Sequence, residues 1–126
     1  MGPGRTGALG ARAERTALQY LVRNGLTPVG ENFQNRGGEI DLIMLHGDCL
    51  VFVEVRFRTS ARFSSPELTI DARKQRKIIR TAAVFLARTK RFALHTVRFD
   101  IVAITGNSAD GIRWIRDAFR PQDSML

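Results

Sequence analysis

Cysteine is almost absent from this sequence: Cys49 is the only one among 126 residues. A single thiol excludes an intrachain disulfide and a zinc site built from several cysteines. The two histidines, His46 and His95, lie far apart in the sequence, which argues against a histidine-based metal site. Aromatic residues make up only 8% of the chain. An aromatic-lined cleft for sugars, and with it a glycosidase, is therefore not expected.

Long apolar runs are also missing, since no segment approaches the roughly 20 residues that a membrane helix needs. The first residues, Met-Gly-Pro-Gly-Arg-Thr-Gly, do not resemble a secretory signal. We therefore expect a cytoplasmic protein without membrane contact. The length predicts one domain, over residues 8–119, which is large enough to fold without disulfides. Residues 1–7 and 120–126 are expected to be flexible termini.

Acidic residues are outnumbered by basic ones, 12 to 20, and the formal net charge is +8. An excess of basic side chains attracts phosphate groups, so nucleic acid, and DNA in particular, is the expected partner. Most of the basic residues are arginines, and a GC-rich genome would produce the same bias without any nucleic-acid function. The sequence leaves the oligomeric state open, a homodimer included.

The pattern of apolar residues predicts a mixed α/β fold. Helices are expected over 8–24 and 70–90, where apolar side chains recur at helical spacing. Strands are expected over 28–35, 38–46, 49–57, 96–105 and 112–117. The 49–57 strand is almost continuously apolar and should lie in the middle of its sheet, buried on both faces. The order α-β-β-β-α-β-β predicts an antiparallel meander and a helical crossover, giving a mixed central sheet flanked by helices.

The connection between the second and third strands yields the sharpest prediction. Gly47-Asp48 reads as a two-residue hairpin loop, which places His46 opposite Cys49. If this register continues, Asp41 lies opposite Glu54, and Glu39 lies opposite Arg56. Cross-strand neighbours have Cβ atoms about 4.5–5.5 Å apart. Two buried carboxylates at that distance require a proton, a cation or a metal, and Mg²⁺ suits carboxylate ligands. The alternative is a surface hairpin in which salt bridges pair these charges.

Each helix adds a candidate residue to this pair. Glu14 falls within the apolar stripe of the first helix and could join Asp41 and Glu54 around a metal, or it could serve a helix start or a buried ion pair. Gln75 falls on the apolar side of the second helix. It could orient a phosphate or a metal-bound water, or it could be a hydrogen-bonded core amide.

Basic residues surround these acids in the sequence. Those on the outer face of the second helix could follow a phosphate backbone or could simply be solvated. The candidates for nucleic-acid contact are Arg58, Arg73, Lys74, Arg76 and Lys77. Arg80 lies on the same helix face as Arg73, Arg76 and Lys77.

Several short motifs carry a resemblance to a known family over residues 7–119. They are Ala13-Glu14 with Ala17 and Tyr20-Leu21, Asn32-Phe33, Gly38–Ile43, Phe52–Arg56, Lys74–Arg76 and Arg98–Asp100. The chain resembles the YraN-like bacterial proteins, a family with the PD-(D/E)xK restriction-endonuclease-like fold. It is also similar to archaeal Holliday-junction resolvases, in which an acid on the first helix joins two acids on adjacent strands.

The resemblance implies roles for individual residues. Asp41 and Glu54 would be catalytic metal ligands for Mg²⁺ or Mn²⁺, and Glu14 a third ligand. Gln75 matches a glutamine near the site. Glu39 belongs to the family's hairpin motif, and the resemblance assigns it no particular role. Arg56 stands where the motif has its lysine, and it would stabilise charge in the transition state. Ala13 stands where a glycine usually precedes the first-helix acid.

Three functional hypotheses follow. The first is a metal-dependent endonuclease-like protein acting on DNA, with branched or damaged DNA as candidate substrates. The second is a catalytically weak or inactive module that binds nucleic acid. Its weak catalysis would follow from Arg56, since an arginine cannot act as a base. The third is an adaptor that uses the fold for contacts with other proteins.

Overall fold

The computed structural model describes residues 7–58, 70–106 and 111–121. Within these ranges the order α-β-β-β-α-β-β is confirmed. The helices are α1 (Ala8–Arg23) and α2 (Ala72–Arg88), and a 3₁₀ turn, η2 (Lys90–Phe92), follows α2. The strands are β1 (Thr27–Asn35), β2 (Gly38–His46), β3 (Cys49–Arg58), β4 (Thr96–Thr105) and β5 (Ile112–Phe119).

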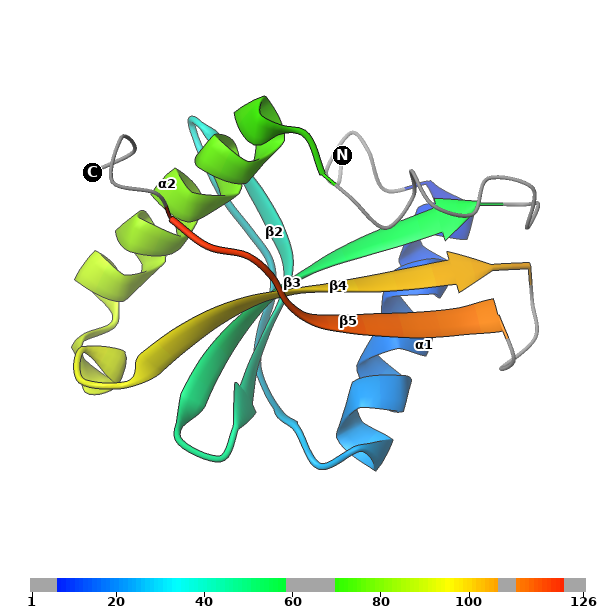
Figure 1. Cartoon of the computed structure of the whole chain (residues 1–126), viewed down its shortest axis with the longest axis horizontal. Helices are drawn as coiled ribbons and strands as arrows, with labels where there is room; N and C mark the ends of the chain where they lie inside the picture. Colours follow the sequence, from blue (N-terminus) through cyan, green and yellow to red (C-terminus); the bar gives the residue numbers. More distant parts are fainter. Residues whose placement is uncertain (1–6, 59–69, 107–110, 122–126) are drawn as a thin grey trace.

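The five strands form one mixed sheet in the order β1-β2-β3-β4-β5 (Figure 1). All neighbours are antiparallel except β3 and β4, which run parallel. A parallel pair needs a crossover connection, and α2 lies in that connection. The predicted mixed sheet flanked by helices is therefore confirmed, with β3 at its centre.

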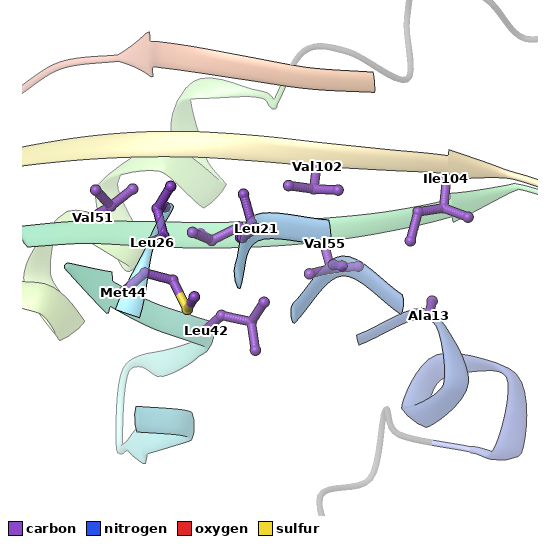
Figure 2. Packing of buried hydrophobic residues seen from close by; sticks show 11 residues of the cluster. Ala13, Leu21, Leu26, Leu42, Met44, Val51, Val55, Val102 and Ile104 are labelled. Atoms are coloured by element: carbon purple, nitrogen blue, oxygen red, sulfur yellow. The ribbon is translucent and has the colours of Figure 1, made fainter. Parts of the chain in front are cut away.

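The two helices cover opposite faces of the sheet. On one face Ala17 and Leu21 of α1 pack with Val51 and Val53 of β3. Figure 2 shows this cluster, with Leu21 and Val51 labelled. On the other face Ile78 of α2 packs against alternate residues of the same strand, Leu50 and Phe52. Successive side chains of a strand point to opposite faces, so a strand between two helices must be apolar at nearly every position. This explains the run of apolar residues in β3.

The predicted hairpin register is confirmed for part of its length only. His46 pairs with Cys49, and the pairing continues in step to Leu42 and Val53, where it ends. The expectation that it would go on to pair Asp41 with Glu54 and Glu39 with Arg56 is wrong. The backbone N–H of Val55 donates instead to Oδ2 of Asp41, at 2.8 Å. A side-chain oxygen of β2 thus accepts the hydrogen bond of a backbone N–H of β3 at the point where the two strands separate.

Several predicted boundaries also shift. The second helix starts at Ala72 because Asp71 caps it, its side chain accepting a hydrogen bond from the backbone of Lys74. The last strand continues to Phe119, two residues beyond its expected end. Residues 59–69, which connect β3 to α2, and most of both termini fall outside the described ranges. Of the helices that the structure describes, none has the length and apolar character of a membrane span.

The β1–β2 turn is fastened to α2 by the buried side chain of Thr81. The Thr81 hydroxyl lies 2.8 Å from the carbonyl oxygen of Lys77 and 3.3 Å from Oδ1 of Asn35. Gly38 packs closely on the same residue, since an added Cβ would lie 3.1 Å from Oγ1 of Thr81. The turn and the helix therefore hold each other at a fixed separation.

This contact gives a stability prediction. Replacing Thr81 by valine keeps the shape but leaves Oδ1 of Asn35 without that hydroxyl, so we expect the free energy of unfolding to fall by about 1 kcal/mol. Urea denaturation followed by circular dichroism measures the change. Thr81→Ser keeps the hydroxyl and is the control. Equal stability of Thr81→Val and the wild type would show that the hydroxyl does not stabilise the turn.

Candidate active site

The two strand acids lie in the interior, where β2 and β3 separate. Asp41 has no exposed surface, and Glu54 is 5% exposed. The hydrogen bond from Val55 holds the Asp41 carboxylate against the residue that follows Glu54. The alternative of a surface hairpin is therefore wrong. Buried carboxylates need specific partners, and the surroundings of both acids show what these are.

Glu54 is paired with a lysine that the sequence analysis had assigned only to phosphate contact. Nζ of Lys74 lies 2.7 Å from Oε2 of Glu54. A buried pair of carboxylates requires a proton, a cation or a metal, and α2 supplies a cation, the ammonium group of Lys74. The signal in the sequence was helical spacing, because Lys74 precedes the buried Ile78 by one helical turn. A lysine is thus present at the second acid although the motif position itself holds Arg56.

Glu14 reaches the same region from α1. It lies in the second turn of the helix and is 8% exposed, so the helix-start alternative is wrong. The Asn32 amide donates to Oε1 of Glu14 at 3.0 Å and to Oε2 of Glu39 at 3.1 Å. The φ angle of Asn32 is 51°, a conformation that asparagine tolerates better than most residues. Asn32 therefore links two acids that are far apart in the sequence, a role that the sequence analysis missed.

Two cavities meet at Glu54 and Lys74, which line both of them. The turn–helix cavity lies between the β1–β2 turn and the start of α2, has a volume of about 640 Å³, and contains Arg36 and Glu39 in its wall. The helix–strand cavity lies between α1 and the end of β3 and has a volume of about 270 Å³. Its wall includes Glu14, Arg56 and Arg58.

The remaining candidates on α2 are less central. The Gln75 amide donates to the carbonyl oxygen of Ile70 at 2.7 Å, which agrees with the core-amide alternative, while a catalytic role remains a prediction. Arg73, Arg76, Lys77 and Arg80 are exposed, and the first and third of these line the turn–helix cavity.

Comparison with known proteins shows the family of this chain. The model of the uncharacterised protein family UPF0102 matches residues 13–104. The chain belongs to this family. UPF0102 proteins of Saccharophagus degradans and Ectopseudomonas mendocina are 49% and 44% identical to it over 110 and 111 residues. The alignments cover 87% and 88% of this chain, and 91% and 93% of the two relatives. The resemblance to YraN-like proteins is thus confirmed.

The UPF0102 match spans all three candidate metal ligands, Glu14, Asp41 and Glu54. Carboxylate oxygens are the donors that Mg²⁺ and Mn²⁺ prefer, so the donor chemistry fits such an ion, and two of these acids line one cavity. In the part of the chain that the structure describes, however, three histidine, cysteine, aspartate or glutamate side chains do not gather closely enough to hold a metal. The fit therefore extends to ligand type and cavity, not to a closed three-ligand site.

A second polar cluster in this UPF0102 chain lies where β4 pairs with β5. Asp100 is fully buried, and Arg98 donates to both of its carboxylate oxygens at 2.9 Å. Trp114 Nε1 and the backbone N–H of Asp117 also donate to it, each at 2.9 Å. The hydrogen bonds to Asp100 raise the pKa of Arg98, while burial and the nearby charge of Arg98 lower the pKa of His46. These fixed bonds indicate a structural role.

Proposed function

We propose that the protein is a metal-dependent endonuclease-like enzyme that acts on DNA, with branched or damaged DNA as candidate substrates. The observation that carries the proposal is the ion pair between the buried Glu54 and Lys74. Both residues line the cavity that Glu14 also lines, and Asp41 binds the backbone of Val55, the residue after Glu54. Acids that can hold a cation, beside a lysine that can contact a phosphate, form the set of groups that metal-assisted phosphodiester hydrolysis uses. The net charge of +8 favours the same substrate class.

Each residue then has a distinct task. Glu54 and Glu14, which line one cavity, would supply ligands to Mg²⁺ or Mn²⁺, and Asp41 would act beside them from the interior. Such an ion lowers the pKa of water and neutralises phosphate charge. The Lys74 ammonium would stabilise the charge that develops on the phosphoryl oxygens. Arg56, in the wall of the helix–strand cavity, would hold a neighbouring phosphate. Asn32 would position Glu14 through its hydrogen bond.

The test is a cleavage assay on end-labelled linear, flapped and four-way DNA with Mg²⁺, Mn²⁺ or a chelator. We expect metal-dependent cleavage by the wild type and a loss of at least roughly 10²-fold in Asp41→Asn and in Glu54→Gln. Calorimetry should show that both variants bind Mn²⁺ more weakly, because each loses a charged ligand. Asp48→Asn and Glu31→Gln remove exposed acids and serve as matched controls.

A second candidate is a module that binds nucleic acid without cutting it. It is favoured by the lack of a closed three-ligand group among the described residues and by the engagement of Glu54 with Lys74. DNA binding without cleavage of any substrate would select this candidate. A protein that neither binds nor cuts DNA would contradict both.

A further inference from the structure

The two cavities share the Glu54–Lys74 pair and together make up a candidate path for a ligand. Both side chains belong to both cavity walls, so the pair lies at the boundary between them. Apart from this pair, the turn–helix cavity is lined by the β1–β2 hairpin and the start of α2, and the helix–strand cavity by α1 and β3. A chain-like ligand could therefore pass over the pair and occupy both cavities.

The wall of the turn–helix cavity is built to stay in place. The Asn35 carboxamide oxygen accepts hydrogen bonds from the backbone of Gly37 at 3.0 Å and from the Thr81 hydroxyl at 3.3 Å. Gly38 lies close enough to Thr81 that an added Cβ would come within 3.1 Å of its oxygen. These contacts hold the backbone of the turn, which carries Arg36 in the wall of the cavity.

Charge along this path is positive at both ends. Arg36, Arg73 and Lys77 are exposed at the turn–helix cavity, and Arg56 and Arg58 line the other one.

The acids of the turn–helix cavity are bound to protein groups. The Asp71 side chain accepts from the backbone of Lys74, Glu54 pairs with the Lys74 ammonium, and Glu39 accepts from Asn32. Four basic side chains against three acids leave this cavity with a positive formal charge, which attracts anions.

We propose that this path holds one unpaired strand of nucleic acid, with phosphates bound on both sides of the Glu54–Lys74 pair. A volume of about 640 Å³ lies in the range of roughly 300–1,000 Å³ that encloses a single drug-sized ligand. One or two nucleotides are of that size, whereas a duplex is not. Proteins that bind a single strand combine a positively charged groove along the backbone with aromatic side chains on which bases stack. Phe57, in the wall of the helix–strand cavity, is the aromatic side chain that the two cavities offer. The proposal rests on the proposed function and names the form of its substrate: a flap, an overhang or another unpaired segment.

The experiment measures binding in a chelator, so that cleavage plays no part. A fluorescein-labelled single-stranded oligonucleotide is titrated with the wild type and with the triple variant Arg36→Gln, Arg73→Gln, Lys77→Gln. Three lost phosphate contacts should reduce the slope of log affinity against log salt by about 2, and the affinity roughly 100-fold near 0.1 M salt. The matched control, Arg23→Gln, Arg88→Gln, Lys90→Gln, removes the same charge from exposed positions outside both cavities.

The outcomes separate the parts of the proposal. A selective loss in the triple variant, together with weaker binding of blunt duplex than of single strand by the wild type, supports it. Equal losses in the triple variant and its control would show that total charge alone drives binding, and would overturn the path. Equal binding of duplex and single strand would overturn the unpaired ligand. Failure of the proposed function alone would appear differently, as selective binding without cleavage when metal is restored.

Discussion

Replacing Asp100 by alanine is expected to lower the free energy of unfolding by about 3–5 kcal/mol, the cost of removing one partner of a buried ion pair. The carboxylate is fully buried and accepts two hydrogen bonds from Arg98 and one from Trp114. It also accepts from the backbone of Asp117, at the irregularity where the pairing of β4 with β5 shifts. Alanine would leave all of these donors without this acceptor.

A loss of that size is a large part of the roughly 5–15 kcal/mol that stabilises an ordinary domain. Urea denaturation measures this loss. Asp100→Asn keeps the shape but not the charge, so its loss should be smaller. It replaces the alanine variant in the measurement if that variant does not fold. Asp117→Asn is the matched control, because Asp117 pairs with Arg120 at the surface and should matter little. The structural role of Asp100 would be contradicted if both positions had equal effects.

The second large effect is expected at Lys74. Removing one preorganised charge from a reacting phosphate slows the reaction by roughly 10²–10³-fold, and Lys74→Ala should reduce metal-dependent cleavage by that factor. The same variant should bind Mn²⁺ at least as tightly as the wild type, because the ammonium now 2.7 Å from Glu54 would no longer compete for its oxygen. Cleavage would thus fall without any loss of metal affinity, which general destabilisation would not produce.

Controls for this prediction come from the same chain. Lys90→Ala removes an exposed lysine beyond the end of α2 and should leave cleavage unchanged. Arg56→Ala tests the position that the motif assigns to its lysine, and it should slow cleavage less than Lys74→Ala does. If Arg56→Ala slowed cleavage more than Lys74→Ala, Arg56 would carry the main catalytic charge, and the Glu54–Lys74 pair would be structural.

The sequence by itself determined the order of the elements, the central place of β3 and the start of the hairpin register. These features are local: a strand alternates its side chains between two faces, and a two-residue loop fixes the pairing next to it. For the same reason the sequence placed Asp41 near Glu54. The pairing of His46 with Cys49 carries both acids to the same part of the sheet.

The tertiary structure alone decided which partners these acids have. Asp41 binds the backbone of Val55 where the strands separate, a change of path that the hairpin pattern does not encode. Lys74 and Asn32 lie far in sequence from Glu54 and Glu14, and they meet them only because α1 and α2 pack on the sheet at particular positions. Helical spacing tells which side of a helix faces the sheet. It does not tell which strand residue lies beneath it, since that depends on the packing of the whole core.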